Sequence, residues 1–156
     1  MVRAGDAILI DFASITNGPL TVDPATLETS LMFGTESHEK KEDFSEWCAF
    51  IDEIYEKEVT TLHPPALFED KPGHFSWLRR PLRELRHILL ACEGSNQEAK
   101  VVLAACLMRF SRQKIETLTS DDAIDLAKNR HCYALVVAER IVKGFSASDK
   151  ERGEKP

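Results

Sequence analysis

Between residues 79 and 87 the sequence carries four arginines and a histidine at helical spacing: Arg79, Arg80, Arg83, Arg86 and His87. At 100° per residue, these five side chains fall within about 120° of arc. Leucines from Leu82 to Leu89 occupy the opposite arc, which predicts a core-facing side. Guanidinium groups present planar pairs of donors that suit carboxylate or phosphate. We therefore expect the arginine face of this helix to point outward and to bind an anionic partner.

The charge of the chain is divided between its two halves. Residues 1–78 carry 15 acidic and 5 basic side chains, whereas residues 79–156 carry 11 acidic and 15 basic ones, for a net charge of −6. The basic excess is concentrated in residues 79–114, with 8 basic side chains against 3 glutamates. A chain of this kind can bind an anionic partner with its basic half, or fold that half onto its own acidic half. The sequence leaves both alternatives open.

The first functional hypothesis is a non-enzymatic accessory or adaptor subunit that binds a protein partner in a larger complex. Arginine is favoured over lysine at protein interfaces, and all four positions of the face are arginine. The alternative is a helical small subunit of a ribonucleoprotein, in which the same arginines and further cations contact the nucleic-acid backbone. The candidates for these further cations are Lys100, Arg109, Arg112 or Lys114. That alternative predicts binding that weakens steeply with salt.

A second alternative comes from the spacing Arg80-x6-His87. It resembles, loosely, the Arg-x4–6-His motif of HEPN ribonucleases, which are helical bundles. The resemblance covers these two residues, and proline follows the arginine directly. It implies that Arg80 and His87 act on the ribose 2′-hydroxyl and the phosphate of RNA, and that cleavage is lost on His87→Ala.

Other catalytic and ligand-binding patterns are missing from the sequence. There is no glycine-rich phosphate loop, no Gly-x-Ser-x-Gly turn and no His-Glu-x-x-His motif. Cys48 and the histidines near it do not stand at metal-ligand spacing. His131 falls within an apolar helical arc, which is typical of a core histidine with one satisfied hydrogen bond. We predict no catalytic residue, cofactor or metal site, and we expect the four cysteines to be free thiols.

The elements that position the candidate binding residues are predicted to be helices. Apolar spacing and capping patterns predict helices at 23–32, 42–58, 81–93 and 95–112, and a last one from residue 119 or 120 to Gly144. The segments 81–93 and 95–112 follow each other so closely that a helical hairpin is expected. Residues 101–108 are apolar nearly all round, which predicts that their helix lies at the centre.

The predicted fold is mainly α, a four- to five-helix bundle with an N-terminal arm containing a short strand or short helix. The arm covers residues 1–41 and packs on the bundle, which covers residues 42–144. The tail at 145–156 has almost nothing to bury and is expected to be disordered. The longest apolar run, Val101–Met108, is far shorter than the roughly 20 residues of a membrane span. We expect a cytoplasmic protein that does not insert into a membrane.

Overall fold

The chain is described here by a computed structural model for residues 20–34, 43–55, 72–93, 96–115, 118 and 120–153. These residues form the helices α1 (Val22–Phe33), α2 (Phe44–Ile54), α3 (Arg79–Glu93), α4 (Asn96–Phe110) and α5 (Asp121–Gly153), with a 3-10 turn η4 (Ser76–Leu78) leading into α3. No strand occurs within the ranges just given. The prediction of a mainly helical fold is therefore confirmed. The strand predicted at residues 7–12 lies outside the described residues.

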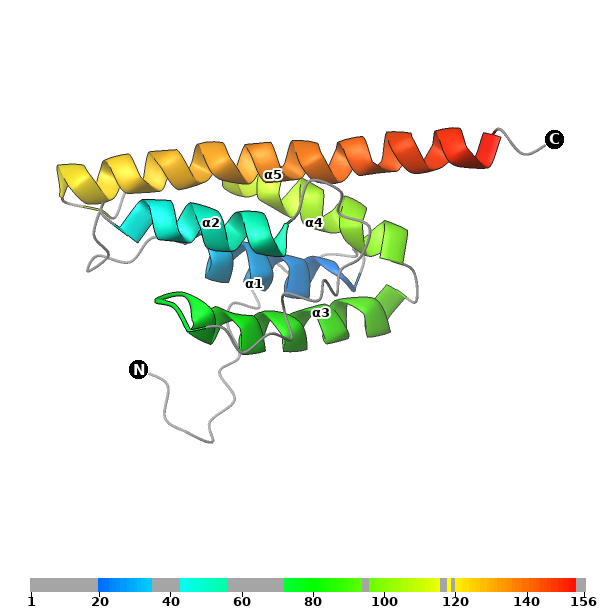
Figure 1. Cartoon of the computed structure of the whole chain (residues 1–156), viewed down its shortest axis with the longest axis horizontal. Helices are drawn as coiled ribbons and strands as arrows, with labels where there is room; N and C mark the ends of the chain where they lie inside the picture. The colour runs from blue at the N-terminus through cyan, green and yellow to red at the C-terminus, as the bar shows by residue number, and fades with distance from the viewer. Residues whose placement is uncertain are drawn as a thin grey trace.

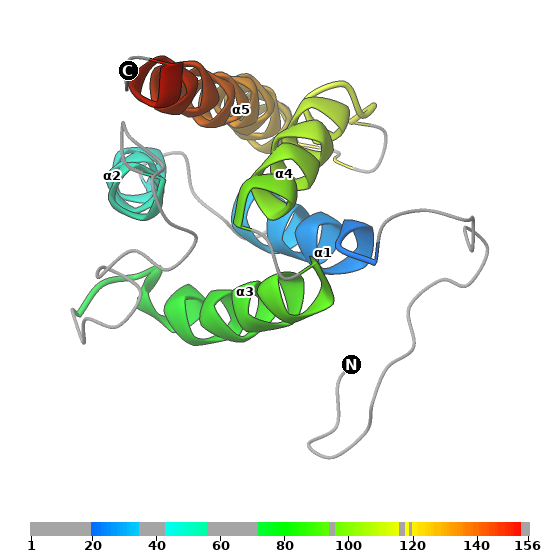
Figure 2. The ribbon, with the colours of Figure 1, turned by 90° about the vertical axis from the view of Figure 1, so that its right-hand side faces the viewer.

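Helix α1 lies between α3 and α4 when the molecule is seen end-on (Figure 2), and it packs on each of them more extensively than they pack on each other. Helices α3 and α4 contact each other, as the predicted hairpin requires, but α1 lies between them along much of their length, so the hairpin is not a tight one. Helix α5 runs antiparallel to α4 along its other side (Figure 1). Residues 22–33 are thus a helix of the bundle itself rather than part of an arm laid on its surface.

The core is built from the apolar stripes of all five helices. Its centre is aromatic: Phe33 and Trp47 meet edge to face with ring centroids 5.5 Å apart, and Tyr55 lies 6.0 Å from Phe33. All three side chains are fully buried. Around them lie the buried aliphatic residues Leu82, Leu89, Leu103, Leu107, Val137 and Ile141. Because Phe33 belongs to α1, the segment that sequence patterns assigned to an arm supplies part of the core centre.

Helix α4 is less enclosed than its composition predicts. Leu103 and Leu107 are fully buried, but Val101 is 52% exposed and Met108 is 42% exposed. Only α1, α3 and α5 cover this helix to any extent in the described part of the chain, and they leave one side open. The expectation that α4 is surrounded on every side is therefore wrong.

Helix α5 is much longer than predicted. It contains 33 residues, about 50 Å at 1.5 Å per residue, and it passes through Gly144 to Gly153. A glycine inside a helix costs about 1 kcal/mol relative to alanine, which is too little to end a helix by itself. The predicted stop at Gly144 is wrong, and residues 145–153 are helical where a disordered tail was expected. Among the described helices, none combines the length and hydrophobicity that a transmembrane span requires.

Candidate functional site

Arg86, expected on the outward face of α3, lies inside the bundle and is 1% exposed. Its Nη2 donates to Oε1 of Glu28 over 2.9 Å, and its Nε lies 3.2 and 3.3 Å from the two carboxylate oxygens. The Tyr55 hydroxyl donates to the same Oε1 over 2.6 Å, and the guanidinium lies 5.0 Å from the centre of the Tyr55 ring. We call Glu28, Tyr55 and Arg86 the buried ionic cluster. It joins α1, the residue that follows α2, and α3.

Arg79 is also directed toward the protein interior. It is 8% exposed, its Nη2 lies 2.6 Å from Oε2 of Glu53, and its guanidinium lies 5.2 Å from the centre of the Phe50 ring. The prediction of four outward guanidinium groups is therefore wrong for Arg79 and Arg86. The physical reason is that both arginines lie on the buried side of α3, where Glu53 of α2 pairs with Arg79 and Glu28 of α1 pairs with Arg86.

The other predicted binding residues do not gather on one surface. Arg80 and His87 are exposed, and Arg83 is half-buried, with its Nε 3.5 Å from the carboxylate of Glu84. Lys100 is 8% exposed, and burial lowers its pKa. The remaining two, Arg109 and Arg112, are exposed at the end of α4, which α1 separates from α3 (Figure 2). The eight residues predicted from sequence are thus divided among the interior and two separate faces.

Arg80 and His87 lie seven residues apart on α3, so they share one side of the helix at about 10.5 Å along its axis. Both are exposed, as a residue that contacts RNA must be. Any two residues seven positions apart on a helix lie on the same side of it, so this placement does not test whether they act together on RNA. The ribonuclease resemblance therefore stays a prediction.

The environment of the buried ionic cluster shifts the acid–base behaviour of its members. Burial raises the pKa of Tyr55 well above its ordinary value, and the neighbouring Glu28 carboxylate adds to this rise. Burial by itself would lower the pKa of Arg86, but the Glu28 carboxylate reverses the effect and raises it. On α5, burial and a hydrogen bond with Asp52 raise the pKa of Tyr133 to about 12. Both tyrosines are therefore held in the neutral form.

These two residues are the only tyrosines in the chain, which gives a direct test. Since their pKa values are raised on folding, the stability that they contribute is complete below about pH 10 and is lost as the pH rises through the raised pKa values, of which that of Tyr133 is about 12. We expect no tyrosinate absorbance from the folded protein near pH 10, where the unfolded chain is half ionised. Titration of the native protein and of the protein in urea would show this difference. Ionisation of either tyrosine near pH 10 in the folded protein would contradict the assignment.

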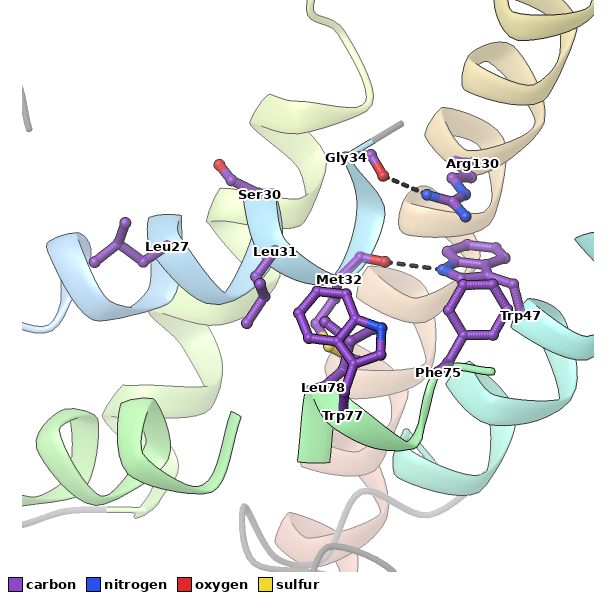
Figure 3. A pocket seen from close by; sticks show the side chains of 10 residues that line it. All are labelled: Leu27, Ser30, Leu31, Met32, Gly34, Trp47, Phe75, Trp77, Leu78 and Arg130. Carbon is purple, nitrogen blue, oxygen red and sulfur yellow. Dashed lines mark hydrogen bonds between the residues drawn. The ribbon is translucent and has the colours of Figure 1, made fainter. Parts of the chain in front are cut away.

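A groove of about 360 Å³ opens at the C-terminal end of α1 (Figure 3). Residues of α1 form one side, and residues of η4 and the turn before it rise toward them from the other. The lining is mostly apolar, with Ser30, the Gly34 backbone and Arg130 as its polar parts. It consists of Leu27, Ser30, Leu31, Met32, Gly34, Trp47, Phe75, Trp77, Leu78 and Arg130. No prediction from sequence placed a site here.

The floor of the groove is held by polar contacts to the end of α1. The Trp47 indole Nε1 donates to the Met32 carbonyl over 2.9 Å, and Arg130 donates to the Gly34 carbonyl. The Arg130 guanidinium also lies 4.7 Å from the centre of the Trp47 ring. A Cβ at Gly34 would stand 2.5 Å from the Ser30 carbonyl oxygen, so the backbone approach here requires glycine. These contacts fix the carbonyl groups at the helix end and give the groove a rigid base.

The rim of the groove carries exposed apolar side chains. Trp77 is 59% exposed and Leu27 is 45% exposed. Trp77 sits in the middle of η4, between Phe75 and Leu78, which are 5% and 3% exposed. The backbone N–H of Leu78 donates to the Phe75 carbonyl over 3.1 Å, and this turn holds Trp77 away from the core that its two neighbours enter. An indole is thus presented at the groove by a turn anchored on both sides.

The remaining candidates for chemistry are explained by packing. The described residues contain no group of three His, Cys, Asp or Glu side chains that could hold a metal ion, and His38 and His63 lie outside those residues. Cys48, Cys106 and Cys132 are free thiols as predicted, and burial raises the pKa of the first two. His131 packs edge to face on Phe110 at 4.7 Å, and burial lowers its pKa.

Comparisons with models of protein families, with curated proteins and with solved structures found no match to this chain. The features of the chain that indicate a function are therefore the groove and the charged residues beside it. The signal that could have indicated the groove is an isolated tryptophan between two apolar residues just before a helix, Phe75-Ser-Trp77-Leu78. A signal for one member of the buried ionic cluster is also present, because Glu28 interrupts the apolar stripe of α1. Arg86 gave no such signal, because its spacing groups it with the other arginines of α3.

Proposed function

We propose that this chain is a helical protein-binding module, an accessory subunit without catalytic chemistry, and that its groove takes up an apolar side chain of a protein partner. The observation that carries the proposal is the exposure of Trp77 at the rim of a groove with a fixed floor. Tryptophan is enriched among the residues that dominate binding energy at protein interfaces. We also propose the cytoplasm as its compartment, supported by three free thiols among the described cysteines.

The charge next to the groove indicates what kind of segment would fit. Arg80 follows Trp77 by three residues and is exposed, so the two side chains lie on the same side of the continuous η4–α3 segment. A partner segment with one large apolar side chain and a carboxylate one turn away would satisfy both. The protein partner expected from sequence is retained in this proposal. Its contact surface, however, moves from the four arginines to Trp77 and Arg80.

Selection from a display library of helical peptides tests this proposal. We expect the enriched peptides to share an aromatic or aliphatic anchor and an acidic residue at helical spacing. Trp77→Ala is expected to weaken the dissociation constant of such a peptide about 30-fold, as at other interface hot spots. The matched control is Ile88→Ala, because Ile88 is 52% exposed on α3 but does not line the groove. Equal binding by the Trp77→Ala and Ile88→Ala variants would contradict the proposal.

The same pair of residues supports a second candidate, binding of single-stranded nucleic acid within a ribonucleoprotein. An exposed indole can stack on a base while a neighbouring guanidinium contacts the backbone. The net charge of −6 and the internal pairing of Arg79 and Arg86 weigh against this candidate. It predicts that any captured complex is lost on nuclease treatment and weakens with salt. The protein-binding proposal predicts that the complex survives the nuclease.

A further inference from the structure

The outer side of α5 carries seven exposed residues spaced alternately by four and three positions. They are Asp121, Asp125, Lys128, Cys132, Leu135, Glu139 and Val142. Leu135 is 52% exposed and Val142 is 46% exposed, and Val136 beside them is 41% exposed. Alternation of four and three is the spacing with which one helix packs lengthwise on another. We call these seven residues the outer seam of α5.

Helix α4 extends the apolar part of this seam. Cys106 lies 3.6 Å from Thr26 and so marks the side of α4 that faces α1. Val101 and Met108, both exposed, lie on the opposite edge, toward α5. On α5, His131 contacts Phe110 of α4, and Leu135 lies one turn further on that same side. The exposed apolar side chains of the two helices therefore border one another on the outside of the bundle.

The charges of the outer seam are arranged for pairing with a second copy. A two-fold axis that passes between Cys132 and Leu135 would relate α5 to an antiparallel second copy. Cys132 of one copy would then lie opposite Leu135 of the other, and Lys128 opposite Glu139. The same axis brings Asp125 beside Val142 and Lys143. In a parallel arrangement Lys128 would face Lys128, and Glu139 would face Glu139. Opposite charges meet only in the antiparallel arrangement, which also gives the self-complementary interface of a two-fold dimer.

The existing partners of these charges do not prevent such pairing. Lys128 lies 3.5 Å from Asp125, and Lys143 lies 2.6 Å from Glu139 within the same helix. All four side chains are more than half exposed, and exposed pairs of this kind contribute little to stability. Rearranging them toward a second chain therefore costs little. We propose that two copies of this chain associate through the outer seam of α5, antiparallel, with Val101 and Met108 of α4 at the edge of the contact.

Sedimentation equilibrium over a wide concentration range tests the proposal, and we expect a monomer–dimer equilibrium. Leu135→Glu is expected to weaken dimerisation at least about tenfold, because it places two glutamates near the two-fold axis. The control is Ile88→Glu, which introduces the same charge at an equally exposed isoleucine of α3. Far-UV circular dichroism checks that both variants remain folded. A monomer at all concentrations, or equal effects of the two variants, would overturn the proposal.

A charge exchange tests the antiparallel arrangement itself. Lys128→Glu and Glu139→Lys should each weaken dimerisation, because each places two pairs of like charges across the interface. An equimolar mixture of the two variants should regain the association, since every pair in the mixed dimer is again of opposite sign. Failure of the mixture to associate more tightly than either variant alone would exclude this pairing. Because the groove is not involved, peptide binding at Trp77 should be unchanged in all these variants.

Discussion

Arg86→Ala is expected to lower the free energy of unfolding by about 3–5 kcal/mol. The substitution leaves the Glu28 carboxylate, which is 0% exposed, with its charge uncompensated inside the protein. It also removes the guanidinium from the face of the Tyr55 ring. The cluster joins three segments of the chain, so its loss should weaken the packing of α1, the end of α2 and α3 on one another. Urea unfolding followed by circular dichroism measures the effect.

The matched control is Arg80→Ala, which removes an exposed arginine from the same helix and should change stability by no more than about 0.5 kcal/mol. The triple variant Glu28→Leu, Tyr55→Phe and Arg86→Met should recover most of the loss, since a buried ion pair can be replaced by apolar side chains of similar volume. Tyr55→Phe is included because the Tyr55 hydroxyl would otherwise lose its acceptor, Glu28, inside the core. If Arg86→Ala and Arg80→Ala were equally stable, Arg86 would have to be solvated. The placement of α1 against α3 would then be wrong.

Trp47→Ala is expected to have an effect of similar size, about 3–5 kcal/mol. Trp47 is 0% exposed and contacts the rings of Phe33, Phe44 and Tyr133. The truncation creates a cavity in the core and deprives the Met32 carbonyl of its donor. It also removes the ring beneath the Arg130 guanidinium. The groove floor should therefore loosen together with the core.

Trp77→Ala serves as the control for this experiment, because the chain contains only these two tryptophans and Trp77 is 59% exposed. It should leave the free energy of unfolding within about 0.5 kcal/mol of the parent while impairing peptide binding. The two variants thus separate the structural from the binding role of tryptophan. Similar losses of stability in both would mean that Trp77 belongs to the core.

Helix positions could be predicted from the sequence because apolar spacing and capping residues act locally. The predicted bounds of three helices agree with the observed ones to within two residues. These predictions were 23–32 for α1, 81–93 for α3 and 95–112 for α4. Helix α2 is shorter than the predicted 42–58; it ends at Ile54, and residues 56–58 lie outside the described residues. The course of α5 past Gly144 was missed because a glycine was read as a stop where its cost is small.

The orientation of α3 could not be predicted from its own sequence. Apolar residues cover about half of the helix surface, and the observed core direction is rotated by roughly 80° from the one expected. That rotation turns Arg79 and Arg86 inward and Ile88 outward. It is determined by Glu28 and Glu53, which belong to other helices. The groove was missed for a related reason, because its lining comes from four separate segments.

Glu28 and Arg86 are 58 positions apart, which has a consequence for how the nascent polypeptide acquires its shape. A ribosome adding roughly 5–20 amino acids per second needs about 3–12 s to progress from the acid to its counter-ion. Throughout that delay the carboxylate would be costly to desolvate, so the first helix stays hydrated. Hydrophobic collapse around it must therefore wait until the third helix has been synthesised, and a translating intermediate remains open to chaperones until then.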